Sequence, residues 1–483
     1  MKKNIFAALI LTFAGGAYCA EFSDLAVNAS VISARAEAMD FKLDPAAVQL
    51  PEGQLAGAVA DLGSKWYGAD SRQARMQFTA NMLYKIPAGY TGAISQVLSN
   101  PSQRQKITEL VNLQLQHMYG AFTTHPGFVD NPGIPSGDYK VTLQGAQDAA
   151  DRGPRYAMIT YTYDDTVVFA KGLFQGGGAT RIQFVLPLDP VTIYSKGFPS
   201  KDSDTNLCTD EHYNSEGDFW YFWNPYQEGC PISGDDLVAV QTDLAPLPVT
   251  HNTYPEYAKL YGNNGGGSTL QVSYLVGVDE GFSSGDLGKK TFQDAFVGLK
   301  GLGFKATADT ARAKKLTLSA GGKTVVIDMQ LMDPNSGEFA AEAVSAMKTA
   351  DIFIYDGHSG LGGYLNPERL AADSGQTLTL PKNKYQIFVF QGCSTYAYYN
   401  SAFFQLKKSS SDPKGSKNLD IITTGIGAAF DVGAKVDVSF IKSVATGQRP
   451  SWQTILDNVR KAEGYNSALS HINGDEDNPK TPN

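Results

Sequence analysis

The sequence predicts an α/β protein whose C-terminal half forms a doubly wound, mostly parallel sheet. Downstream of residue 269, short runs of β-branched and aromatic residues alternate with segments of helical periodicity. Strand and helix in alternation are typical of a parallel sheet covered by helices on both faces. A Gly- and Asn-rich run at residues 262–268 separates this half from an upstream region of different character.

The C-terminal half, residues 269–465, contains five expected strands and four expected helices. The strands are expected at residues 270–278, 324–328, 351–355, 385–390 and 419–424. The helices are expected at residues 291–302, 337–348, 394–406 and 452–462. Residues 466–483 form a polar tail, and we expect its end, from residue 474, to be frayed.

The N-terminal region, residues 21–262, is predicted to be helical to about residue 125 and β-rich beyond it. Helices are expected at residues 56–66, 71–84 and 103–119, and strands at 156–163 and 181–188. The stretch 218–225 is dense in aromatic residues, including Trp220 and Trp223. We expect it to be a buried edge of the β-rich part, with an exposed contact platform as the alternative.

The first 20 residues have the features of a secretory signal peptide. Lys2 and Lys3 precede an apolar run at residues 5–14, which is too short to span a bilayer, and small residues follow. We therefore expect a secreted or periplasmic protein without an integral membrane segment after signal cleavage. The net charge of −9 over 483 residues argues against nucleic acid or anionic membrane as the main partner. The sequence suggests no cofactor.

Four cysteines are present, and export makes disulfides possible. Cys19 is expected to leave with the signal peptide, and Cys208 and Cys230 most simply pair with each other. The alternative for this pair is a zinc site completed by His212, four residues after Cys208. Cys393 is then left over, either as a reactive thiol or as a buried residue that acts as a small hydrophobe.

The main functional indication is that Cys393 and His358 each follow a short apolar run, a polar residue and a glycine. Both residues are therefore expected at the carboxyl ends of consecutive strands, where open α/β sheets bind ligands. A thiol needs a neighbouring base to become a nucleophilic thiolate, and imidazole is the usual base. The other five histidines lack this setting.

Gly357-His358 and Gln391-Gly392-Cys393 resemble the site of the caspase–gingipain–legumain superfamily of cysteine peptidases, over about residues 269–462. That resemblance implies a caspase-like sheet with histidine and cysteine at the ends of adjacent strands, Cys393 as nucleophile and His358 as general acid/base. The family has glycine directly after the histidine, whereas here Ser359 intervenes before Gly360. The backbone of Ser359 or Gly360, with that of Cys393, is the expected oxyanion donor pair. Further residues expected to line the site are Gly357, Gly392, Asp356 and Gln391.

The resulting functional hypothesis is an exported cysteine endopeptidase that acts on protein or peptide substrates through a thioester acyl-enzyme. The alternative is a non-catalytic periplasmic or surface binding protein on a degenerate caspase-like scaffold, because a fold can persist after its activity is lost. In that case the region before residue 262, with its aromatic stretch, would carry recognition.

Overall fold

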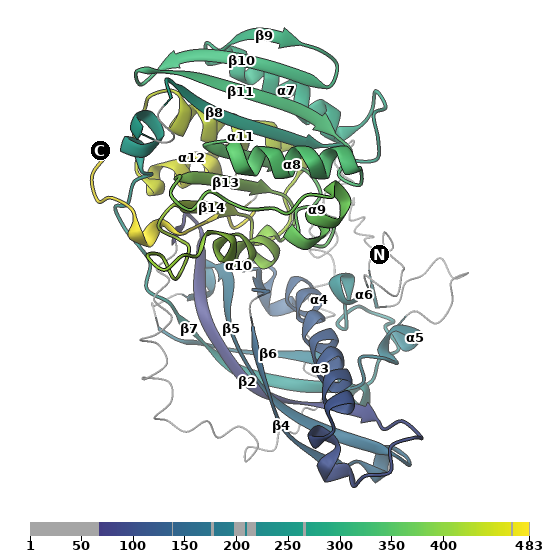
Figure 1. Cartoon of the computed structure of the whole chain (residues 1–483). Helices are drawn as coiled ribbons and strands as arrows, with labels where there is room; N and C mark the ends of the chain where they lie inside the picture. Colours follow the sequence, from purple (N-terminus) through teal and green to yellow (C-terminus); the bar gives the residue numbers. More distant parts are fainter. Residues whose placement is uncertain are drawn as a thin grey trace, which may run out of the picture.

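The computed structural model describes residues 67–137, 139–174, 178–197, 208–209, 219–263, 267–464 and 467–482. Four sequence-based expectations lie outside the described residues: the signal peptide, Cys19, His212 and the helix at 56–66. Within these ranges the chain builds two sheets, one in each half (Figure 1). No helix in the described ranges is long and apolar enough to cross a membrane.

The C-terminal half contains a nine-stranded mixed sheet with a parallel centre. Its five parallel strands stand in the order β11, β8, β12, β13, β14. Their bounds are β8 Thr269–Gly277, β11 Lys323–Met332, β12 Ile352–Asp356, β13 Gln386–Gln391 and β14 Leu419–Thr423. The outer strands are antiparallel: β10 (Ala313–Ala320) and β9 (Lys305–Asp309) at one edge, β15 (His471–Asn473) and β1 (Tyr67–Gly68) at the other. The predicted α/β class and the five expected strands are confirmed.

Helices cover both faces of this sheet (Figure 1). On one face lie α7 (Leu287–Gly301), α11 (Phe430–Ala445) and α12 (Trp452–Ala462), which share a core with Val272 and Tyr274 of β8. On the other lie α8 (Gly337–Thr349), α9 (Pro367–Ser374) and α10 (Thr395–Lys407), packed against Phe353 and Phe388. A sheet buried on both faces needs apolar residues at every position, which explains the uninterrupted apolar runs of the central strands.

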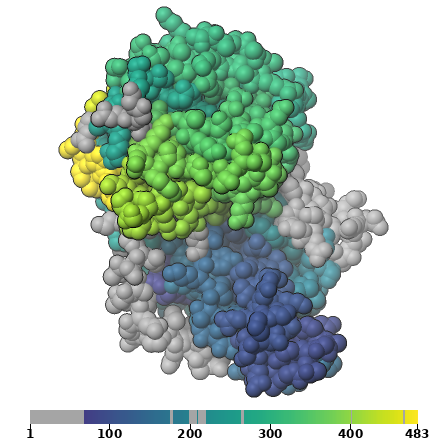
Figure 2. Space-filling model, in the orientation of Figure 1, coloured from purple at the N-terminus to yellow at the C-terminus, as the bar shows by residue number. Residues whose placement is uncertain are grey.

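The N-terminal half is an antiparallel sheet in the order β3, β5, β2, β7, β6, with β4 also paired to β5. The strands are β2 Ser71–Lys85, β3 Gly133–Pro135, β4 Lys140–Asp148, β5 Tyr156–Ala170, β6 Thr180–Pro187 and β7 Leu237–Pro246. The helices α3 (Pro101–Gln116) and α4 (Met118–Thr123) contribute to its core, next to the short η2 (Ile94–Ser99). Figure 2 shows this half in contact with the α/β half above it.

The expectation of a helix at residues 71–84 is wrong, because this segment is β2, which pairs with β5 along its whole length. The physical reason is the spacing of its buried apolar side chains. These are Ala74, Met76, Phe78, Ala80, Met82 and Tyr84, which recur at every second position. A period of two places them all on one face of a strand.

The two halves are joined at β1, which belongs to the α/β sheet although it lies in the N-terminal region. Immediately after it, Ser71 Oγ lies 2.8 Å from Nδ1 of the buried His471 in β15. The segment after β15 is also packed, since Asp475 is fully buried and accepts a hydrogen bond from Thr253 Oγ1 at 2.6 Å. The expectation of a frayed tail from residue 474 is therefore wrong for the described residues.

Cys208 and Cys230 form the predicted disulfide. Because both sulfurs are in this bond, they are not available as thiolate ligands, and the zinc alternative does not hold. The bond lies in a cluster with the fully buried Trp223 and the short helix α6 (Phe219–Phe222). The aromatic stretch is thus a buried edge beside the disulfide, as expected, and Trp223 is not part of an exposed platform.

Candidate active site

His358 and Cys393 follow two strands that are direct neighbours. β12 and β13 pair in parallel, with Asp356 opposite Gln391, and each functional residue comes two positions after its paired strand end. Both residues line one small recess, about 10 Å³ in volume, together with Ala428 and Phe430. That volume is about what one water molecule needs.

The glycine before each of these residues lets the two strand ends approach closely. A Cβ on Gly392 would lie 2.6 Å from the carbonyl oxygen of Gly357, a distance that no real side chain tolerates. Gly357 itself has a φ of 153°, in the region that L side chains rarely adopt. The Gly357 N–H donates to the carbonyl of Gln391 at 3.0 Å and ties the two ends together. The glycines are therefore required by the close contact of the two loops.

Cys393 lies on a tight turn between β13 and α10. The next residue, Ser394, is in the left-handed region with a φ of 55°, uncommon for a residue other than glycine. Thr395 holds the turn from both sides: its Oγ1 donates to the carbonyl of Phe390 at 2.8 Å and accepts from the Thr424 N–H at 2.9 Å. Cys393 lines the recess and is 8% exposed.

The imidazole of His358 is held by a carboxylate. Its Nε2 lies 2.7 Å from Oδ1 of Asp279, and the ring of Phe430 packs edge-on against it with centroids 5.1 Å apart. The side chain of His358 is 33% exposed and that of Asp279 is 15% exposed. Because Asp279 accepts the proton of Nε2, Nδ1 is the ring nitrogen that remains to accept another proton.

Asp279 is fixed in turn by Asp286, the N-cap residue of α7. One oxygen of Asp286 accepts the backbone N–H groups of Asp279, Glu280 and Gly281 at 3.0 to 3.1 Å, and the other accepts that of Lys289 at 2.8 Å. The loop that carries Asp279 follows β8. The next parallel strand, β11, lies on one side of β8 and the following strand, β12, on the other, so the strand order reverses at β8. Such a reversal is the usual ligand-binding point of open α/β sheets. The sequence prediction missed both carboxylates. The available signal was a carboxylate soon after the first parallel strand.

Ser359 and Gly360 do not line the recess, but their loop is firmly positioned. The carbonyl of Ser359 accepts from Tyr399 Oη at 3.0 Å and from the Tyr364 N–H at 3.2 Å, and Gly360 has a φ of 57°. The backbone nitrogen of Ser359 lies 3.7 Å from where a Cβ on Gly392 would be. The backbone nitrogen of Ser359, one of the two alternatives for the donor beside Cys393, is thus near the glycine that precedes Cys393.

Asp356 and Gln391 line the recess and are both buried. Burial, reinforced by the neighbouring carboxyl of Asp437 in α11, raises the pKa of Asp356 well above its usual range. Burial likewise raises the pKa of Asp437, to about 7. Two adjacent buried carboxyls cannot both be charged without penalty, so this pair retains a proton at neutral pH.

Cys393 is disulfide-bonded in the structure, which corrects the expectation of an unpaired thiol. Cys208 and Cys230 pair with each other, so the partner of Cys393 is not among the described residues. A cysteine attacks a carbonyl carbon as the thiolate, and a sulfur held in a disulfide cannot do so. Any nucleophilic role for Cys393 therefore requires reduction of this bond by a thiol, through thiol–disulfide exchange.

No protein-family model matches the chain, and no curated protein matches it. Among the described residues, no group of three or more His, Cys, Asp or Glu side chains is arranged to hold a metal ion. The functional argument therefore depends on the geometry around Cys393, His358 and Asp279.

Proposed function

We propose that the protein is an exported cysteine peptidase related in fold to the caspase–gingipain–legumain superfamily. The observation that carries this proposal is the pairing of β12 with β13, which brings His358 and Cys393 into one recess while Asp279 holds the imidazole. A carboxylate, an imidazole and a thiol in this relation are the parts of an activated nucleophile. The parallel sheet with helices on both faces agrees with the fold that the resemblance implies.

The proposed reaction begins with reduction of the Cys393 disulfide by a thiol compound, which is itself oxidised. Nδ1 of His358 then takes the proton of the Cys393 thiol, and the thiolate attacks the scissile carbonyl carbon. The imidazolium returns the proton to the leaving amine as the C–N bond breaks, leaving a thioester. Water, deprotonated by the same nitrogen, hydrolyses the thioester and releases the acid.

Backbone N–H groups supply the oxyanion site in this proposal. The candidates are those of Cys393 and Ser359, since Ser359 approaches Gly392 and its carbonyl is fixed by Tyr399. Asp279 has a positioning role, because its bond to Nε2 sets the tautomer in which Nδ1 is the base.

A non-catalytic binding protein on the same scaffold is the second candidate. Two observations favour it: Cys393 is disulfide-bonded, and the recess has room for about one water molecule rather than a peptide bond. A peptidase requires the thiol to be released and the recess to widen for substrate, whereas a binding protein requires neither.

The test compares wild type with the Cys393→Ala and His358→Ala variants on a mixed peptide library, with and without a thiol reductant. The expected result is cleavage by reduced wild type and a loss of at least a hundred-fold in each variant. His251→Ala is the matched control, because His251 is an exposed histidine outside the recess, and it should retain full activity.

Reactivity of the thiol gives a second readout that needs no substrate. After mild reduction, iodoacetamide should alkylate Cys393 rapidly at mildly acidic pH, and His358→Ala should slow that reaction. Equal cleavage by wild type and Cys393→Ala would remove Cys393 from the mechanism. An alkylation rate that is the same with and without the imidazole would favour the binding protein.

A further inference from the structure

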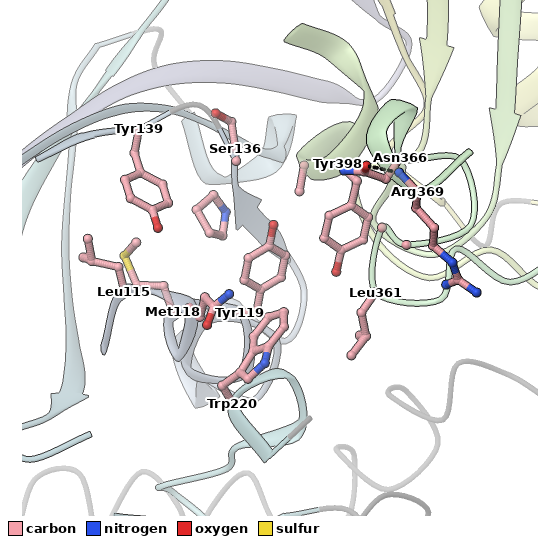
Figure 3. A pocket seen from close by; sticks show the side chains of 16 residues that line it. Leu115, Met118, Tyr119, Ser136, Tyr139, Trp220, Leu361, Asn366, Arg369 and Tyr398 are labelled. Carbon is pink, nitrogen blue, oxygen red and sulfur yellow. Dashed lines mark hydrogen bonds between the residues drawn. The ribbon is translucent and has the colours of Figure 1, made fainter. Parts of the chain in front are cut away.

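A cavity of about 400 Å³ lies between the two halves of the molecule, next to the candidate active site (Figure 3). The N-terminal half contributes α3, α4, the segment after β3 and Trp220 of α6 to its wall. The α/β half contributes the loop at residues 361–363, α9 with Asn366 before it, and the start of α10. Its volume falls within the range of ordinary ligand pockets.

The α/β side of this cavity is built from the same two loops that carry the catalytic pair. Leu361 comes three residues after His358, and Ala397 comes four residues after Cys393. Three residues span at most about 11 Å, so the cavity wall begins within one substrate residue or two of the recess. The halves also meet here directly, because Tyr221 Oη of α6 lies 3.0 Å from Oγ of Ser394.

Aromatic rings line the cavity on both sides. Tyr119 of α4 stacks on Tyr398 of α10 with ring centroids 6.2 Å apart, and Trp220 meets Tyr119 edge-on at 5.3 Å. Figure 3 shows these three side chains close together. The cluster shows both the stacked and the edge-on geometry that ring pairs prefer, and an aromatic guest would extend it in the same way.

No carboxylate is found among the residues that line the cavity in the described ranges. Arg369 lines it, but its guanidinium bonds Oδ2 of Asp373 at 3.2 Å and Oδ1 of Asn335 at 3.2 Å. Figure 3 shows this guanidinium directed away from the rings. The cavity therefore offers no counter-charge to a basic side chain, and its one cation is already paired. These properties favour an uncharged guest.

Leu361 lines the cavity and has a strained backbone conformation. It is 39% exposed, and only Val191 and Val297 are other exposed large hydrophobic residues in the described chain. Its φ is 51°, between Gly360 at 57° and Gly362 at 83°, so three consecutive residues occupy the left-handed region. Strain of this kind, on an apolar residue left in water, is typical of binding sites.

We infer that this cavity binds the aromatic side chain of a polypeptide substrate, at a residue next to the scissile bond. The inference rests on the proposed peptidase function and adds the substrate class to it. The ring would pack against the cluster of Tyr119, Trp220 and Tyr398, beside Leu361. The N-terminal half would then contribute directly to substrate selection.

The test uses internally quenched peptides in which each residue flanking the scissile bond is varied, with reduced protein. Wild type should prefer Phe, Tyr or Trp over Ala at one flanking position by at least about ten-fold, the discrimination that an apolar pocket typically provides. Leu361→Asp adds a carboxylate and should raise the relative rate for Lys at that position at least about five-fold over Leu361→Asn. Asn is the matched control, because Asp and Asn both tolerate a positive φ.

Cleavage without aromatic preference, or identical profiles for Leu361→Asp and Leu361→Asn, would overturn the inference while leaving the peptidase proposal intact. A binding experiment covers the opposite case, in which the aromatic site exists but the protein does not cleave peptides. In Cys393→Ala protein, ligand-observed NMR should show binding of a tetrapeptide amide containing Phe and none of its Ala counterpart, and Leu361→Asp should abolish the difference. If this holds without any cleavage by wild type, the aromatic site stands and the catalytic proposal fails. Absence of selective binding overturns the site.

Discussion

Replacing Asp286 with alanine is expected to uncouple Asp279 from His358 without touching either side chain. Asp286 is 5% exposed, and its carboxylate accepts three N–H groups from residues 279–281 and one from the first turn of α7. Without it, nothing described fixes the loop so directly, and Asp279 is free to swing away from Nε2. The imidazole then loses the partner that selects its tautomer.

The expected loss of stability follows from these four bonds. Removal of an N-cap side chain costs about 1 kcal/mol. Hydrogen bonds to charged groups contribute about 1.5 to 3 kcal/mol each, but the three loop N–H groups can be rehydrated, because Glu280 is exposed and its neighbours are partly exposed. We count them together as about 2 kcal/mol. For a folding unit of about 200 residues, the size of the α/β half, the total of about 3 kcal/mol corresponds to a fall in melting temperature of roughly 6–12 °C.

The assay measures the melting temperature together with the alkylation rate of reduced Cys393 from pH 5 to pH 9. Asp286→Ala should melt lower and should also lose the rate at mildly acidic pH that depends on the imidazole. Ser336→Ala is the matched control, because Ser336 is the N-cap of α8, accepts from the Phe339 N–H at 3.1 Å and does not contact Asp279. An Asp286→Ala variant that melts lower, yet keeps the alkylation profile of Ser336→Ala, would refute the positioning role.

Three other predictions concern stability. Burial raises the pKa of Glu463 from 4.5 to about 7, so the stability that the protonated carboxyl provides is fully present below pH 4.5 and is lost as pH rises through about 7. In urea titrations, Glu463→Gln should therefore raise the free energy of unfolding by up to about 3 kcal/mol at pH 8 and by little at pH 5. The pKa values of Asp356 and Asp437 are also raised, so the free energy of unfolding of Asp437→Asn should increase relative to that of wild type as pH rises from 5 to 8. A difference that does not depend on pH would contradict the shared proton. Replacing Cys208 and Cys230 together by serine should remove about 3 kcal/mol, measured by the same titration under non-reducing conditions.

The sequence predicts a strand correctly where its local residue pattern matches the burial of that strand in the fold. β12 and β13 were predictable because a strand buried on both faces must be apolar at each position, and the glycine after each marks its end. The composition of β2 predicts a helix because Ala, Met, Gln and Arg favour helices, although its buried apolar residues recur at every second position from Ala74 to Tyr84. In that segment the period of two predicts the observed structure and the composition does not.

The candidate site was predictable only in the part that a single chain segment encodes. His358 and Cys393 carry their own signal, a glycine-preceded position at a strand end. Asp279 acquires its role only when β8 lies beside β12, and its one local signal is its place soon after the first parallel strand. The aromatic cavity is less accessible still, because Tyr119 and Tyr398 meet across nearly 280 positions of sequence. Contacts of such separation depend on topology and not on local preference.

The pairing of β1 with β15 has a consequence for the order in which the protein is assembled. Tyr67 meets Ile472, so about 400 residues must be synthesised between the two partners of this ladder. The entropic cost of closing so long a loop is modest, since each doubling of loop length adds only about 0.6 kcal/mol. The long separation does, however, make this ladder one of the last to form. Until then the outer edge of β15, the strand that covers β14, is available to strands of other chains. A fragment that starts at residue 269 keeps β15 but lacks β1, and should therefore aggregate more readily than the whole chain.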